Sequence, residues 1–259
     1  MRRDLITRRA ALTGVMGVGG LILSGCDKIA QVPAFRSMLE FAERMNHGGQ
    51  RLVLTSDQPL AREYQRSDIT KNFKANGTVR PQTPEYQRLQ MGGFSDYKLK
   101  IEGLVENPME FSLTELKAMP SRTQITRHDC VEGWSAIGEW TGVQLSNLLK
   151  MAQLKPNARF IVFHCADDLD NSPNGLGIYY ESIDLIDAFH HQTIMAYMMN
   201  GEPLPVAHGA PLRVRIERQL GYKMAKYVMR IEAVESFSNM GLGRGGFWED
   251  RGYEWYAGI

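Results

Sequence analysis

A tight β-hairpin is predicted by the run Ala196-Tyr197-Met198-Met199-Asn200-Gly201-Glu202-Pro203-Leu204-Pro205. The Asn-Gly pair at its centre favours the positive φ angles of a two-residue turn. Residues 193–199 and 202–206 are therefore expected to form the two strands. A second run follows, His208-Gly209-Ala210-Pro211-Leu212-Arg213, and leads into an alternating strand over residues 212–216.

The segments around the hairpin predict more strands than helices. Further strands are expected at residues 97–102, 122–128, 159–164 and 228–235, and helices at residues 113–119, 143–152 and 182–190. Ser112 and Glu115 form a capping box for the first helix, and Ser182 is expected to cap the last. Strands with short interspersed helices indicate an α+β fold rather than a doubly wound sheet.

Composition is typical of a globular protein. The chain has 259 residues, 43% of them hydrophobic, which suits one large domain or two small ones. The formal net charge of +1 provides no basic surface that would indicate a nucleic-acid partner. Three cysteines are too few for a disulfide scaffold.

The N-terminal segment is typical of an export signal. Residues 1–23 have an arginine-rich start and then a weakly apolar stretch. Thr7-Arg8-Arg9-Ala10-Ala11-Leu12 resembles the twin-arginine export motif, and Leu23-Ser24-Gly25-Cys26 resembles a bacterial lipobox. Cys26 would then carry a lipid anchor, with a plain signal peptide as the alternative.

Four parts are expected along the chain. Residues 1–25 form the signal peptide with its lipobox. Residues 26–95 form a loop-rich segment, because they contain many glycines and prolines and show little periodicity. Residues 96–236 form the core domain, and residues 237–259 form a tail rich in glycine and aromatic residues.

One cysteine lies in an unusual setting. It belongs to the run Arg127-His128-Asp129-Cys130-Val131-Glu132-Gly133-Trp134-Ser135, at the end of the predicted strand 122–128. A turn-like Trp140-Thr141-Gly142 follows. Taken alone, the Cys130 thiol is compatible with a metal ligand, a nucleophile or a small core residue.

The hairpin run, the His208–Arg213 run and the segment Gly221-Tyr222-Lys223-Met224-Ala225-Lys226 together resemble the molybdopterin-binding domain of the sulfite oxidase family. The resemblance covers roughly residues 70–235. The run Cys130-Val131-Glu132-Gly133-Trp134-Ser135 is most similar to the branch of bacterial periplasmic methionine-sulfoxide reductase catalytic subunits.

This resemblance implies a molybdenum ion held by a molybdopterin cofactor, with the Cys130 thiolate as the protein ligand. The remaining residues that it assigns to cofactor binding are Asn76, Gly77, Cys165, His208, Arg213, Met224, Ala225 and Lys226. Arg213 is suited to gripping the pterin phosphate with two hydrogen bonds. Glu132 and Trp134 are expected either to shape the catalytic mouth above the metal or to begin a structural turn.

The resemblance also implies an activity. The expected reaction is a two-electron oxygen-atom transfer on a small S-oxide or N-oxide. Sulfite oxidases place an arginine beside the cysteine to bind their anionic substrate, whereas here Arg127 precedes Cys130 and none follows closely. Sulfite oxidation therefore stands as the alternative within the same fold.

Partners follow from the same resemblance. The chain has no haem-binding Cys-x-x-Cys-His and no cysteine set for an iron–sulfur cluster, so electrons must come from another protein. A cytochrome or membrane haem protein is expected by analogy. The dimerising immunoglobulin-like domain of sulfite oxidases is not in this chain, so a monomer located in the periplasm is expected.

Two other classes of function stay open at this point. Cys130 would be a nucleophile if His128 or His164 acted as its base. A non-enzymatic lipoprotein would use the aromatic residues 247–256 to bind a partner.

Two motifs match known ligand sites only superficially. A dinucleotide fingerprint is matched by Gly241-Leu242-Gly243-Arg244-Gly245-Gly246, but no long helix can follow it. Asp168 and Asp170 only loosely match a calcium loop, since Pro173 replaces its glycine.

Overall fold

The computed structural model describes residues 32–35, 37–38, 41–42, 45, 48–49, 60–170 and 175–259. The chain divides into residues 1–57 and 58–259. The described residues from 33 to 49 in the first unit are helical. The expected signal peptide and Cys26 lie outside the described residues. Among the described helices, none is long and apolar enough to cross a membrane.

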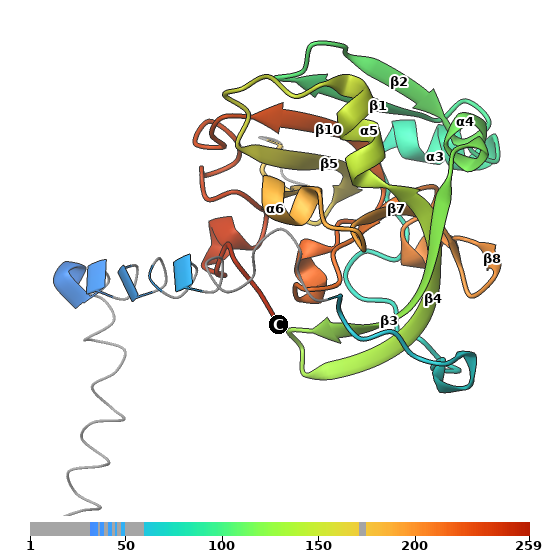
Figure 1. Cartoon of the computed structure of the whole chain (residues 1–259), viewed down its shortest axis with the longest axis horizontal. Helices are drawn as coiled ribbons and strands as arrows, with labels where there is room; N and C mark the ends of the chain where they lie inside the picture. The colour runs from blue at the N-terminus through green and yellow to red at the C-terminus, as the bar shows by residue number, and fades with distance from the viewer. Residues whose placement is uncertain are drawn as a thin grey trace, which may run out of the picture. The chain divides into compact units, whose positions relative to one another are not determined.

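Two sheets form the second unit (Figure 1). The first has the strand order β2-β1-β10-β5-β6. Its strands are β1 (Lys98–Gly103), β2 (Met109–Ser112), β5 (Phe160–Asp168), β6 (Ile178–Asp184) and β10 (Val228–Val234). β1 and β10 pair in parallel, and the other neighbours are antiparallel.

The second sheet has the order β3-β4-β7-β8, with β9 paired to β7. Its strands are β3 (Ser121–Cys130), β4 (Trp134–Gln144), β7 (Ile194–Met199), β8 (Glu202–Pro203) and β9 (Arg213–Arg215). Long β3 and β4 form an extended hairpin that closes where Cys130 pairs with Trp134 (Figure 1). The expected α+β class is confirmed.

The turn of the predicted β7–β8 hairpin is confirmed, but its second strand is shorter than predicted: β8 ends at Pro203, and a 3-10 turn begins at Val206. Asn200 has φ 54° and Gly201 has φ 83°, so both turn residues adopt the left-handed conformation that Asn-Gly tolerates. Met199 pairs with Glu202 directly across the turn. The turn is also held by the side chain of Asn200, which accepts a hydrogen bond from the Glu139 backbone N–H at 2.9 Å.

Short helices connect the strands. They are α3 (Pro84–Met91), α4 (Leu113–Ala118), α5 (Leu145–Ala152) and α6 (Leu185–Ala188), with 3-10 turns η1 (Arg66–Asp68), η2 (Val206–His208), η3 (Gly221–Lys223) and η4 (Glu249–Arg251). The capping box of Ser112 and Glu115 at α4 is confirmed. Helix α5 buries one face, as its leucine spacing predicts.

Two local predictions were wrong. Ser182 lies inside β6, and Asp184 instead caps the short α6, because residues 178–184 pair with β5 before the helix begins. The turn-like Trp140-Thr141-Gly142 lies inside β4, where ladder pairing to β3 and β7 overrides the local turn preference. Most of the described residues from 60 to 95 lie outside helices and strands, and the helix among them, α3, has Pro84 in its first turn.

The strand over 212–216 is shorter than predicted and has no exposed face. Arg213 and Arg215 are 1% and 0% exposed. Both guanidinium groups lie over the buried indole of Trp140, at 4.9 and 4.4 Å from the ring centroid. In an alternating strand the polar side chains commonly form a solvated face, but Arg213 and Arg215 pack inward against an aromatic ring.

Gly142 marks the tightest crossing of β4 and β7. A Cβ at this position would overlap the backbone carbonyl of Met195, at the register shift between the two strands. We therefore expect Gly142→Ala to lower the free energy of unfolding by about 1–3 kcal/mol, because rigid backbone must move. Chemical denaturation measures this loss. Gly92→Ala is the control, since its Cβ would meet only ordinary contacts at 3.7 Å; equal losses in both variants would contradict the expectation.

The C-terminal segment is part of the folded unit. Phe247 is 2% exposed, and Gly246 bridges to Glu181 of β6. The chain ends beside β3 (Figure 1), where Ile259 and Arg127 line the same surface depression. No described helix follows the glycine run 241–246 except the 3-10 turn η4, so the dinucleotide match has no supporting structure.

Candidate active site

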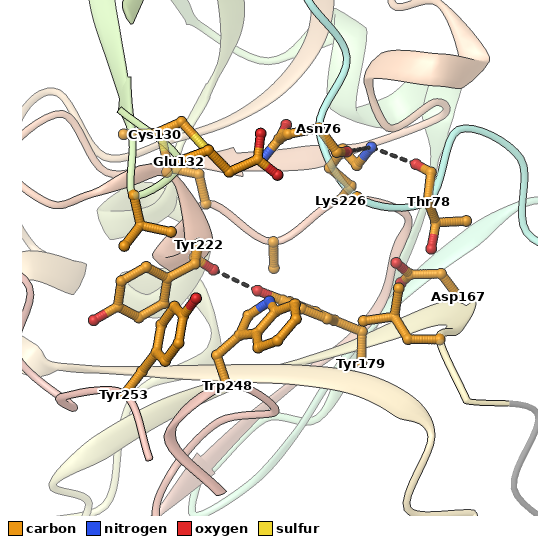
Figure 2. Close-up of a pocket in the computed structure, with 16 residues that line it drawn as sticks. Asn76, Thr78, Cys130, Glu132, Asp167, Tyr179, Tyr222, Lys226, Trp248 and Tyr253 are labelled. Carbon is orange, nitrogen blue, oxygen red and sulfur yellow. Dashed lines mark hydrogen bonds between the residues drawn. The ribbon is translucent and has the colours of Figure 1, made fainter. Parts of the chain in front are cut away.

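One cavity lies where β3, η3, the loop before α3 and the C-terminal segment meet (Figure 2). It encloses about 700 Å³, counted out to its open mouth. Its lining residues are Asn76, Gly77, Thr78, Cys130, Val131, Glu132, Asp167, Leu169, Tyr179, Gly221, Tyr222, Met224, Ala225, Lys226, Trp248 and Tyr253. Six predicted site residues besides Cys130 are among them: Asn76, Gly77, Glu132, Met224, Ala225 and Lys226.

Cys130 ends β3 and faces the cavity as a free thiol, 8% exposed. The Gly133 backbone N–H donates to the Cys130 carbonyl at 3.0 Å, which closes the hairpin turn beside it. Burial raises the pKa of the Cys130 thiol, and the nearby Glu132 and Val131 backbone N–H groups oppose that shift. The strand end therefore holds one sulfur at a defined place in the wall.

His128 lies two residues earlier on β3 and is fully buried behind the wall. Its Nδ1 is 3.0 Å from a guanidinium nitrogen of Arg215 and 3.3 Å from the sulfur of Met224. Burial and then the charge of Arg215 hold the pKa of His128 well below its usual value. A Cβ on Gly221 would overlap the His128 ring, so glycine lets η3 approach β3 closely.

Lys226 lies in the opposite wall of the cavity and holds neighbouring loops through hydrogen bonds. Its ammonium donates to the backbone carbonyls of Asn76 at 2.6 Å and Ala207 at 3.0 Å, and also to that of Thr78. These bonds hold the loop at 76–78 over the cavity (Figure 2). Burial, and then the charge of Arg213, lowers the pKa of Lys226 to about 7.

Arg213 and His208 lie behind Lys226 and do not line the cavity. The Arg213 guanidinium donates to the carbonyls of His208 at 3.0 Å and Met224 at 3.2 Å. Gly209 has φ 113° and lies between the side chains of Lys226 and Arg213. A Cβ at position 209 would contact both side chains too closely, so glycine allows them to approach each other. The resemblance correctly placed these segments together, but a cofactor contact by Arg213 or His208 stays a prediction.

This corner of the site contains the basic side chains of Lys226, Arg213 and His208. Burial and then Arg215 lower the pKa of Arg213 to about 9, and burial and then Arg213 lower that of His208 to about 4. The Nε of Arg213 is buried and has no hydrogen-bond partner among the described residues. Positive groups that destabilise one another in this way favour a bound anion.

Asp167 was not predicted. Asp167 is 4% exposed and lines the cavity. Its Oδ1 has no hydrogen-bond partner among the described residues. Burial raises its pKa to about 6, against the opposing charge of Lys226. Figure 2 shows Asp167 beside Thr78, at the far end of the cavity from Cys130. The sequence signal is the acidic end of β5, Asp167-Asp168, of which only Asp168 enters the loose match to a calcium loop.

Trp134 and Cys165 lie outside the cavity lining. The Trp134 indole N–H donates to Glu132 at 2.8 Å, and Lys74 pairs with the same carboxylate at 3.1 Å. These two partners lower the pKa of Glu132. Cys165 is packed in the main hydrophobic core. A catalytic role for Trp134 and a cofactor role for Cys165 stay predictions.

The aromatic C-terminal segment is the largest addition to the predicted site. Trp248 and Tyr253 line the cavity together with Tyr222 of η3. The sequence had assigned residues 237–259 only to tail packing or partner binding. No group of three or more His, Cys, Asp or Glu side chains able to hold a metal ion occurs among the described residues.

Residues 86–240 match the family model described as the oxidoreductase molybdopterin-binding domain. The chain belongs to this family. It is 36% identical over 256 residues to a protein of Azospira oryzae named provisionally as the protein-methionine-sulfoxide reductase subunit YedZ1, covering 98% of this chain and 89% of that one. The family membership makes the protein a molybdopterin-dependent oxidoreductase.

Two other similar proteins cover less of the chain. The methionine-sulfoxide reductase catalytic subunit MsrP of Xanthomonas campestris is 35% identical over 150 residues, covering 54% of this chain and 46% of that one. The crystal structure of the sulfane dehydrogenase SoxCD from Paracoccus pantotrophus matches with a TM-score of 0.49 and 26% identity, covering 55% of this chain and 39% of that one.

The residues around the cavity fit the family cofactor. The thiol of Cys130 is a soft ligand of the kind that suits a transition metal. The positive charges of Arg213 and Lys226 suit an anionic phosphate. The unpartnered Asp167 Oδ1 suits an N–H donor of a pterin ring. The lining thus provides a sulfur donor, the ammonium of Lys226 and a polar acceptor in one cavity, with Arg213 behind Lys226.

Proposed function

We propose that the protein reduces a neutral S-oxide by a two-electron oxygen-atom transfer. In this reaction a sulfoxide, two protons and two electrons give a sulfide and water. The observation that carries the proposal is the Cys130 thiol opening into the cavity whose far end holds Lys226 and Asp167. The relatives named as methionine-sulfoxide reductase subunits support the substrate class.

When bound, the molybdenum–pterin group supplies a metal that changes oxidation state by two electrons and exchanges an oxygen atom. Cys130 would be its protein ligand, and the described side chains would bind and orient the rest. Lys226 would hold the loop at 76–78 against the pterin, with Arg213 providing positive charge and the neutral imidazole of His208 a hydrogen bond for the phosphate. Met224 and Ala225 would present backbone groups from the segment after η3.

Sulfite is disfavoured by the position of the nearest arginine. The Arg127 guanidinium bonds to Asp129 at 2.9 Å and lines a separate surface depression with Tyr64 and Ile259. Lys74, the cation near the cavity mouth, is paired with Glu132. A sulfite dianion at Cys130 would thus find little uncompensated positive charge close by, whereas a neutral oxide needs none.

The thiol-nucleophile alternative is disfavoured by the two histidines it requires. His128 faces Arg215 and Met224, and His164 bonds to Glu232 at 2.8 Å on the other sheet. A nucleophilic cysteine needs a base within hydrogen-bond reach, and both imidazoles are engaged elsewhere. The alternative of a partner-binding aromatic tail is disfavoured by the packing of Phe247 into the core.

We further propose a periplasmic location reached by the twin-arginine route, with a lipid anchor at Cys26, and a membrane haem protein as the electron donor. The twin-arginine-like and lipobox-like runs support the route and the anchor. The relatives named as reductase subunits support a separate electron-donating partner.

The test uses full-length protein purified from its native periplasm. We expect molybdenum and pterin in equal amounts, and turnover of methyl sulfoxides with a reduced viologen dye as electron donor. A panel of a sulfoxide, an N-oxide and sulfite separates the substrate classes. Active protein without molybdenum would contradict the cofactor assignment, and oxidation of sulfite as the only reaction would contradict the S-oxide proposal.

A further inference from the structure

The cavity has an aromatic wall, which we define as Tyr222, Trp248 and Tyr253. Trp248 and Tyr253 stack with ring centroids 5.3 Å apart at 25°, and Tyr222 meets Tyr253 edge-on at 5.2 Å and 82°. Figure 2 shows the three rings across the cavity from Cys130 and Glu132. The wall thus faces the place where the reacting atom must lie if Cys130 is the metal ligand.

The wall is held rigidly in place. The Tyr222 hydroxyl donates to the Glu254 carbonyl at 2.6 Å, and the Tyr179 hydroxyl donates to the Tyr222 carbonyl at 2.5 Å. The Tyr253 backbone N–H donates to the Trp248 carbonyl at 3.0 Å. Beneath the wall, the Lys223 ammonium is buried between Glu249 and Glu181 and ties the C-terminal segment to β6. Preorganised aromatic groups bind at a low entropic cost.

The wall differs in chemistry from the rest of the cavity. Asn76, Thr78, Asp167 and Lys226 place polar and charged groups at the far end (Figure 2). The wall instead presents uncharged ring faces, two of them from residues beyond the matched family domain, which ends at residue 240. The polar end suits the cofactor, which leaves the aromatic end for the substrate.

We propose that the aromatic wall is the substrate subsite, and that it binds the apolar arm of a neutral sulfoxide while the S=O group points toward Cys130. This inference rests on the proposed S-oxide reduction. Ring faces attract apolar groups and the partly positive sulfur of a sulfoxide, and they offer nothing to a carboxylate or a sulfite. The wall therefore selects aryl or thioether-like methyl sulfoxides over smaller or anionic substrates.

The test compares binding and turnover of methyl phenyl sulfoxide and dimethyl sulfoxide by the holoenzyme. Tyr253→Leu removes a wall ring from a side chain that is 38% exposed, so the fold should tolerate it. Tyr253→Phe keeps the ring and removes only the hydroxyl. We expect Tyr253→Leu to weaken binding of methyl phenyl sulfoxide about tenfold and to leave dimethyl sulfoxide nearly unchanged, because one lost apolar contact costs this much discrimination. Tyr253→Phe should bind both like the wild type.

Turnover gives the second readout. With a reduced viologen dye as electron donor, Tyr253→Leu should raise KM for methyl phenyl sulfoxide and keep kcat, since the wall positions the substrate and takes no part in bond making. Thermal unfolding and molybdenum content confirm that each variant is folded and loaded. A folded, loaded Tyr253→Leu with unchanged preference between the two sulfoxides would overturn the subsite.

Failure of the proposed function is distinguishable from failure of the subsite. Binding is followed by quenching of Trp248 fluorescence, with Trp248→Phe to identify that signal, and needs no turnover. If the wild type binds methyl phenyl sulfoxide through Tyr253 but reduces no sulfoxide, the subsite stands and the reaction assignment falls. If the wild type reduces sulfoxides with no effect of Tyr253→Leu, the reaction stands and the subsite falls.

Discussion

Cys130→Ser should leave a folded protein with more than a hundredfold less oxygen-atom transfer. Serine differs from cysteine by one atom and fits the same 8% exposed position at the end of β3. An alcohol, however, does not ionise to a soft sulfur donor, and the metal would lose its protein ligand. Changes that act only indirectly on a metal site already cost about 10–100-fold, so loss of the ligand itself should cost more.

The measurement pairs activity with metal content and thermal stability. Ser135→Ala is the matched control, because Ser135 pairs with Asp129 at the same hairpin end and contributes no ligand. The control should keep activity and molybdenum content close to those of the wild type. Full turnover by Cys130→Ser would show that the thiol is no ligand, and equal losses in both variants would mean that the hairpin end, rather than the sulfur, matters.

Lys223→Met should lower the free energy of unfolding by about 3–5 kcal/mol, the usual cost of removing one partner from a buried ion pair. The Lys223 ammonium lies 2.5 Å from both Glu181 and Glu249, and all three side chains are at most 1% exposed. Burial, and then the neighbouring Glu249, raises the pKa of Glu181 well above its usual value. Without the ammonium, two carboxyl groups would face each other in a site closed to water.

Urea denaturation measures this loss, and Arg88→Met is the control. Arg88 pairs with Asp96 at 3.5 Å, but both side chains are more than 60% exposed, so we expect a change below about 1 kcal/mol. Because Glu249 belongs to the C-terminal segment, Lys223→Met should also increase cleavage by protease within residues 241–259. A loss no larger than that of Arg88→Met would show that the buried triad contributes little.

Local patterns predicted the elements whose partners are close in the sequence. The Asn200-Gly201 turn, the capping box of α4 and the leucine face of α5 each depend on neighbours within a few residues. Ser182 and Gly142 were misplaced because strand pairing with distant segments decided their conformation. Local propensity is a weak guide wherever such long-range ladders form.

The candidate site also divides into residues that the sequence predicted and residues that only long-range packing places there. The resemblance to the family identified a set of residues that the fold gathers around one cavity: Cys130, Glu132, Asn76, Gly77, Met224, Ala225 and Lys226. Asp167, Tyr222, Trp248 and Tyr253 were missed as site residues, because isolated aspartates and aromatic residues in a tail have many ordinary roles. The contribution of Trp248 and Tyr253 follows from the path of the C-terminal segment back across β6 to η3, where it meets Tyr222, whereas Asp167 reaches the cavity from the end of β5.

By itself, the sequence determined the family, the α+β class and the position of Cys130 at a strand end. These features depend on short motifs and local periodicity, which are visible in neighbouring residues. Only the tertiary structure decided that Arg213 and Arg215 are buried against Trp140, that Asp167 faces the cavity, and that the aromatic wall closes it. Burial and contact between distant segments depend on how the whole chain packs, and no window of neighbouring residues contains that information.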